Sequence, residues 1–199
     1  MKKLFGVLFV AGVTASILSF NSNEISDFEG TNAPDLQSSY VSWRGSKADP
    51  ATGKDKAHYG NVGIKDAKVK LKANTLEALT VTVDLDKMTN QDLPAEMQGK
   101  LVSHLKSADF FDIVKYPDAT FTSTKITKLT GDKFQFNMEG NIKVRGVSQP
   151  IEVKGHLVQD KGKTLLESEV FYLNGEKFGF IKPGGGYNNV EFRVQLYVN

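Results

Sequence analysis

The chain has 199 residues, of which 40% are hydrophobic and 10% aromatic. This length and composition predict one folded globular domain. Of 25 basic side chains, Lys2 and Lys3 lie in the first 20 residues, which leaves 25 − 2 = 23 basic against 23 acidic groups. A neutral domain lacks the attraction for phosphate that nucleic-acid binding needs, so nucleic acid is excluded as an expected partner. The sequence has no cysteine, which excludes disulfides and a lipidated N-terminal cysteine.

Residues 1–20 have the pattern of a secretory signal peptide. Two lysines precede the apolar run LFGVLFVAGVTASILSF, and a polar segment follows. The run ends without an A-x-A cleavage site, so we expect cleavage but leave an uncleaved anchor open. Residues 21–37 are polar and without periodicity, which predicts a flexible tether. The folded domain is therefore expected over 38–199.

Alternation of apolar and polar side chains dominates the domain, and this is the period of a strand with one buried face. It is clearest in KFQFNMEGNIKVR, residues 133–145, where one face carries Phe134, Phe136, Met138, Ile142 and Val144. Further strands are predicted over 39–46, 67–73, 79–86, 119–129, 150–157, 164–173 and 190–198.

Short turns such as KANT, TGD and DKGK join several of these strands. The fold class is therefore mainly β. Eight antiparallel strands with one apolar face predict a closed barrel, whose interior is wide enough for side chains or one small ligand. An immunoglobulin-like sandwich is the alternative architecture.

One amphipathic helix interrupts the strands, in the segment DLPAEMQGKLVSHLKS. Its apolar residues Leu93, Met97, Leu101 and Leu105 are spaced four apart. Asp92 is predicted to be the N-cap, with Pro94 in the first turn. We expect the apolar edge to lie against one end of the barrel.

The segment after this helix, 104–121 (HLKSADFFDIVKYPDATF), combines two phenylalanines with two acids. We interpret it as a clasp that fixes the helix over the barrel mouth. Ser107 or Asp109 is expected to cap a short turn, and Phe110 or Phe111 to reach the interior. Asp109 and Asp112 are expected to accept hydrogen bonds from nearby backbone donors.

Motifs for chemistry are weak in this sequence. His58, His104 and His156 have no metal-ligand spacing, and we assign them surface or capping roles. PGGGYNN lacks the ending of a phosphate-binding loop and precedes a strand, so it is read as a flexible loop. No Gly-x-Ser-x-Gly motif occurs, and nothing else converges on Asp109 and Asp112 as catalytic carboxylates. No enzymatic activity and no metal site are predicted.

Three segments of the sequence resemble those of a known family. HLKSADFFDIVKYPDATFTSTKI is similar to the signature segment of the YceI family of lipid- and polyisoprenoid-binding proteins. HYGNVGIKDAKVKL, from His58, and GNIKVRGVSQPIEV, with Gly140, Gly146, Val147 and Pro150, resemble two further family patterns. The resemblance implies a lipocalin-like barrel that holds a long apolar chain in its lumen, in a protein exported to the bacterial periplasm or secreted.

The predicted function is therefore to bind or carry an apolar isoprenoid or related lipid, without a cofactor. A quinone-binding redox accessory and a structural or interaction barrel with a filled lumen are the alternatives, and a homodimer is left open. The residues predicted to line the lumen and bind the lipid are Leu101, Leu105, Phe110, Phe111, Phe121, Phe134, Phe136, Val144, Val153, Phe171, Phe192 and Val194.

Overall fold

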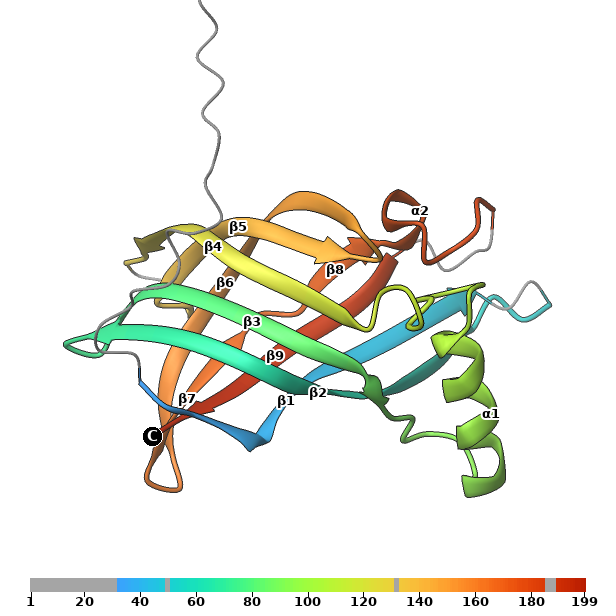
Figure 1. Cartoon of the computed structure of the whole chain (residues 1–199), viewed down its shortest axis with the longest axis horizontal. Helices are drawn as coiled ribbons and strands as arrows, with labels where there is room; N and C mark the ends of the chain where they lie inside the picture. Colours follow the sequence, from blue (N-terminus) through green and yellow to red (C-terminus); the bar gives the residue numbers. More distant parts are fainter. Residues whose placement is uncertain (1–31, 49–50, 131–132, 185–188) are drawn as a thin grey trace, which may run out of the picture.

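The computed structural model describes residues 32–48, 51–130, 133–184 and 189–199. These residues form one antiparallel sheet that closes on itself through the pairing of β1 with β9 (Figure 1). The strands are β1 (Pro34–Ala48), β2 (Asp55–Lys72), β3 (Thr75–Met88), β4 (Asp118–Lys128), β5 (Phe136–Val144), β6 (Val147–Asp160), β7 (Lys163–Ser168), β8 (Phe171–Asn174) and β9 (Asn189–Val198). The helices are α1 (Ala95–Lys106) and α2 (Gly175–Phe178).

The barrel wall has eight strand positions, as predicted, although it is built from nine strands. The segment expected as one strand over 164–173 is divided into β7 and β8, which pair with successive parts of β9. Together they occupy the seventh of the eight positions in the described sheet, where β7 pairs with both β6 and β9 and β8 pairs with β9. The barrel prediction is therefore confirmed, and the sandwich alternative is wrong.

The start of the domain differs from the prediction. β1 begins at Pro34, so residues 34–37 belong to a strand although they were expected in the tether over 21–37. Further upstream, Asn32 forms a bridge with Val69 of β2. The predicted signal peptide, 1–20, and residues 21–31 lie outside the described residues.

Two-residue turns set the register of three hairpins. Ala73–Asn74, Arg145–Gly146 and Lys161–Gly162 all have positive φ, between 47° and 79°. Two consecutive residues with positive φ form the turn whose twist matches that of the flanking strands. The predicted turns KANT and DKGK are confirmed, whereas residues 131 and 132 of TGD lie outside the described part.

The alternation in the sequence places apolar side chains inside the barrel. In β5, every second residue from Phe136 to Val144 is buried. At the end with the β2–β3 turn, buried side chains of the described core fill the barrel interior. Among them are Val69, Leu76, Leu196 and Val198, each exposed by 2% or less. This end of the barrel is therefore closed by its own core.

Helix α1 lies at the opposite end, on the same side of the barrel as α2 (Figure 1). Its N-cap residue is Pro94, whose carbonyl accepts from Met97 and Gln98, so the prediction of Asp92 as N-cap is wrong. No helix residue is fully buried. Leu101 and Leu105 are half-buried, whereas Met97 is 43% exposed. Only part of the predicted apolar edge therefore contacts the barrel.

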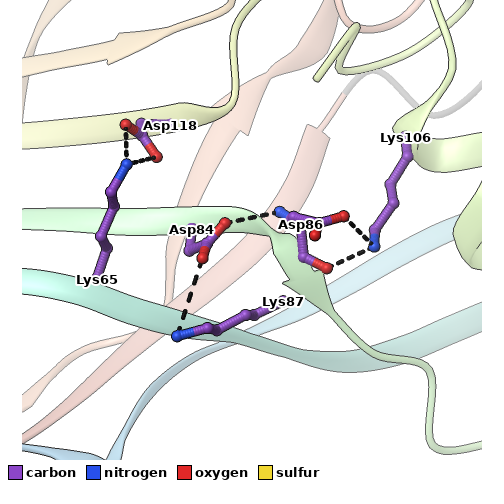
Figure 2. Close-up of polar contacts among 6 residues, drawn as sticks. All are labelled: Lys65, Asp84, Asp86, Lys87, Lys106 and Asp118. Atoms are coloured by element: carbon purple, nitrogen blue, oxygen red, sulfur yellow. Dashed lines mark hydrogen bonds and ion pairs between the residues drawn. The ribbon is translucent and has the colours of Figure 1, made fainter. Parts of the chain in front are cut away.

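Polar contacts attach the end of α1 to the barrel wall. Figure 2 shows Lys106 of the helix donating to the backbone carbonyl of Asp86 and, at 2.9 Å, to its carboxylate. On the same surface, Lys65 of β2 reaches across β3 to Asp118 of β4 at 2.8 Å. In the described part of the chain, no helix combines the length and apolar character needed to cross a bilayer.

Candidate functional site

The barrel interior contains a cavity of about 370 Å³. Its lining is apolar except for Gly45, His58, His104, Thr120 and Ser168. The volume lies in the range typical of small-molecule sites, about 300–1,000 Å³. An apolar space of this size is suited to a ligand that is itself mostly hydrocarbon.

Most of the residues predicted for the lumen line this cavity. They are Leu101, Leu105, Phe110, Phe111, Phe121, Val144, Val153, Phe171, Phe192 and Val194. They come from α1, the clasp segment and the strands β4, β5, β6, β8 and β9. The structure thus brings together side chains that are far apart in the sequence.

Phe134 and Phe136 do not line the cavity. Phe136 is buried in the closed end, where its ring packs over Gly155. Phe134 precedes the start of β5, and its ring lies against His156 with centroids 5.7 Å apart. The strand alternation that would turn Phe134 inward therefore does not extend to this residue. Phe136 therefore points into the barrel interior, as predicted, but at its filled end, whereas Phe134 lies outside the cavity lining.

Sequence reasoning missed other lining residues. Trp43, Met88, Phe180 and Ile181 all border the cavity. Phe180 and Ile181 follow α2 and are exposed by only 1% and 6%. In the sequence, these two residues belong to the short apolar segment FGFI, which precedes the glycine-rich stretch PGGGYNN. Residues 185–188 of that stretch lie outside the described part.

The clasp segment carries the two phenylalanines into the lumen. Phe111 is 8% exposed and its ring stacks on Phe180, with centroids 4.9 Å apart. Phe110 meets the ring of His104 edge-on at 4.8 Å. Ser107, not Asp109, caps the turn, because its hydroxyl accepts from the Asp109 N–H.

Arg145 holds this segment to the barrel. Its guanidinium donates to the carbonyls of Phe110 at 2.5 Å and Ala108 at 2.9 Å, and also to that of Gly179. A planar group with five donors is suited to joining several carbonyls. Arg145 therefore links the clasp, the β5–β6 turn and the residues after α2.

The two acids of the clasp do not accept backbone hydrogen bonds as expected. Asp109 pairs with Lys182 at 2.7 Å, and this hydrogen bond lowers the pKa of Asp109. The carboxylate of buried Asp112 lies 3.7 Å from Lys115, and it is its backbone carbonyl that accepts, from Lys115 and Tyr116. The predicted anchoring role for the two carboxylates is corrected accordingly.

His58 and Asp92 form a polar pair at the cavity rim. His58 Nδ1 lies 2.7 Å from Asp92 Oδ2, and the His58 side chain is 38% exposed. Asp92 also accepts from the Tyr59 N–H at 2.9 Å and from Asn90 Nδ2 at 2.6 Å. Burial alone would raise the pKa of Asp92, but these hydrogen bonds hold it below its usual value.

The other histidines occupy different places. His104 projects from α1 to the cavity, whereas His156 lies 3.3 Å from Glu167 and does not line it. The surface assignment agrees with the exposure of His104 and of the His58 side chain, but it did not anticipate that both histidines also border the cavity. Among the described residues, no group of three His, Asp or Glu side chains could hold a metal ion.

A closed antiparallel barrel with an apolar lumen and helices at one end is a lipocalin-like barrel. The sequence model of the YceI-like domain matches residues 34–199. The chain therefore belongs to the YceI family, as its sequence motifs indicated.

Relatives and solved structures agree with this assignment. A UPF0312 protein of Pseudomonas putida is 34% identical over 126 residues, which are 60% of this chain and 62% of that protein. The chain thus matches about three-fifths of the length of this curated relative. Protein YceI of Escherichia coli O157:H7 is 40% identical over 55 residues, 28% of this chain and 27% of that protein.

Two crystal structures share the fold. Burkholderia cenocepacia BcnA superposes with a TM-score of 0.65 at 20% identity, over 84% of this chain and all of that chain. A YceI protein of Campylobacter jejuni gives a TM-score of 0.53 at 21% identity, over 69% of this chain and 83% of that chain.

Proposed function

We propose that this protein binds or carries an apolar isoprenoid or related lipid in the barrel lumen. The observation that carries the proposal is the cavity of about 370 Å³, whose lining is almost wholly apolar. Membership of the YceI family, which the sequence motifs associate with lipid and polyisoprenoid binding, supports the same function.

The energy of chain burial is sufficient for this role. Each buried CH₂ group contributes about 0.8 kcal/mol, so ten such groups contribute about 8 kcal/mol. This corresponds to a dissociation constant of about 1 μM before the cost of ordering the chain is subtracted. A cavity that holds only part of a long chain can therefore retain it.

Two alternative functions remain distinguishable by experiment. A quinone-binding redox accessory would hold a lipid and transfer electrons, whereas a structural barrel would hold none. We favour binding or transport without catalysis, because the lining is apolar over most of its surface and is suited to a hydrocarbon ligand.

Native mass spectrometry with lipid extraction of the purified protein tests the proposal. We expect a co-purifying prenyl lipid, which Val83→Trp should displace because Val83 lines the cavity. Thr82→Trp is the matched control, since Thr82 pairs with the exposed Asp66 and shares its outward face. Absence of lipid from the wild-type protein, or equal lipid in both variants, would contradict lumen binding. Redox activity of the loaded protein would favour the quinone alternative.

We also propose that the chain is exported to the periplasm or the medium, guided by residues 1–20. The two lysines followed by an apolar run support this proposal. Fractionation of cells should recover the barrel domain outside the cytoplasm, and deletion of residues 2–20 should retain it inside. Full-length protein in the cytoplasm would contradict the proposal.

A further inference from the structure

Few groups on the cavity lining are able to form a hydrogen bond with a ligand. Ser168 donates to the Glu169 carbonyl and accepts from the Val194 N–H, and the Trp43 indole donates to the Thr89 carbonyl. Thr120 pairs with Lys143, which is exposed, so its side chain shares the outward face. Among the described residues, the imidazoles of His58 and His104 are therefore the remaining polar side chains on the cavity lining.

The strand register places His58 on the inner face. His58 lies opposite Gly45 of β1, and Gly45 lies opposite Val190 of β9. Val190 is buried and lines the cavity, and directly paired residues point to the same side of a sheet. Gly45, the partner of His58 in β1, has no side chain and also lines the cavity. The cavity therefore extends beside the imidazole of His58.

Asp92 determines which ring nitrogen faces a ligand. A carboxylate only accepts hydrogen bonds, so the Nδ1 atom of His58 carries a proton in the 2.7 Å contact. Asp92 is itself held by the Tyr59 N–H and by Asn90, which is 4% exposed. Nε2 of His58 has no protein partner among the described residues. It accepts from a hydroxyl when the ring is neutral and donates to a carbonyl when the ring is protonated.

The charges around the lumen argue against an anionic head group. No lysine or arginine of the described residues lines the cavity. Three basic groups at this end already have partners: Lys106 contacts Asp86, Lys182 contacts Asp109, and Arg145 contacts three carbonyls. A diphosphate group in the lumen would therefore find no lysine or arginine on the described cavity lining to bind it.

We propose that the cavity rim is a head-group site for an uncharged oxygen, a hydroxyl or carbonyl, on the lipid that fills the lumen. His58 binds the oxygen, and Asp92 is a positioning residue that fixes the imidazole. This inference rests on the proposed lipid-binding function and extends it to the class of head group.

Three ligands with the same carbon chain test the inference: geranylgeraniol, the corresponding hydrocarbon and geranylgeranyl diphosphate. The wild-type protein should bind the alcohol about three- to tenfold more tightly than the hydrocarbon, the effect of one added hydrogen bond. It should bind the diphosphate more weakly than the alcohol. His58→Phe should bind the alcohol and the hydrocarbon equally, with hydrocarbon affinity retained. Tyr59→Phe, on the outer face of the same strand, should keep the wild-type preference.

Asp92→Asn tests the positioning role. Imidazole ¹⁵N chemical shifts should report a proton on Nδ1 of His58 in the wild-type protein and a changed proton distribution in the variant. The preference for the alcohol should fall while the hydrocarbon still binds. If Asp92 only attached the chain near α1, the variant would lose stability and affinity for both ligands together, with the ring signature unchanged, and the positioning role would be wrong.

The outcomes separate this inference from the function on which it rests. If the wild-type protein binds none of the three ligands, lipid binding is wrong and the head-group site with it. If the hydrocarbon binds but the alcohol has no advantage, or the diphosphate binds most tightly, lipid binding stands and the head-group inference is overturned. An unchanged preference in His58→Phe would overturn it as well.

Discussion

At the scale of single residues, Phe111 connects the clasp to the cavity. Its buried ring stacks on Phe180, so Phe111→Ala should leave a hole between the clasp and the barrel. We expect a loss of about 3–5 kcal/mol in the free energy of unfolding and weaker lipid retention. Denaturant unfolding and lipid extraction measure the two effects.

Asp112→Asn is the matched test of catalysis at the neighbouring residue. Asp112 has a φ of 50°, a conformation that asparagine also tolerates. We therefore expect near-normal stability and binding. A harmless Phe111→Ala beside a severely impaired Asp112→Asn would contradict the clasp interpretation and support a catalytic carboxylate.

Arg145 should contribute more than a usual surface arginine, because its three acceptors lie in two different segments. Arg145→Met should cost about 1.5–3 kcal/mol in stability, the range for hydrogen bonds to charged groups. Hydrogen exchange should increase in the backbone around 108–113. Arg145→Lys should restore only part of the loss, since lysine lacks the planar fork. Equal stability of all three proteins would show that the contacts are unimportant.

The sequence predicted lining residues wherever a strand keeps its alternation, as at Val144, Val153 and Phe192. It could not show that Phe136 lies in the filled end, because the same alternation holds in both ends of the barrel. The His58–Asp92 pair was also hidden, since 34 positions separate the two residues. Only the docking of the segment before α1 onto β2 brings them together.

At the scale of elements, an ion pair fastens β1 to β7. Lys163 Nζ lies 2.5 Å from Asp35 Oδ2. This hydrogen bond, with another from Ser38, lowers the pKa of Asp35 from 3.8 to about 2. A carboxyl whose pKa is lower in the folded state stabilises the fold above its unfolded pKa, and this stabilisation is lost as the pH falls through the folded value.

Asp35→Asn tests this contribution. The variant should be less stable than the wild-type protein at neutral pH, and the difference should diminish between about pH 4 and pH 2. Urea midpoints measured over this range provide the comparison. A difference independent of pH would mean that Asp35 acts through packing or uncharged hydrogen bonds rather than through its charge.

Strand elements were predicted better than the helix and its ends. Period-two patterns and turn residues determine hairpins locally, as at Lys161–Gly162. The N-cap of α1 was misassigned because Asp92 has stronger partners in β2 than at the helix terminus. At the break between β7 and β8, the Glu169 carboxylate accepts from the Lys154 N–H of β6, a contact between distant segments that local sequence patterns do not reveal.

At the scale of the whole molecule, closure joins the first and last strands of the barrel. β1 pairs with β9 along most of its length, and the β2–β3 end is filled while the helix end borders the cavity. A ligand in this lumen would contact strands from every part of the sheet. Occupancy should therefore stabilise the molecule as one unit rather than a single segment.

Thermal unfolding of lipid-depleted and lipid-loaded protein tests this coupling. A ligand that binds only the folded state, at one hundred times its dissociation constant, adds about 2.7 kcal/mol. For a domain of this size the unfolding temperature should rise by about 5–10 °C. Val83→Trp, whose side chain would occupy the cavity, should show no rise, whereas Thr82→Trp should respond like the wild-type protein. If lipid raises the unfolding temperature of Val83→Trp as much as that of the wild-type protein, the lipid binds outside the lumen, because the cavity of that variant is already filled.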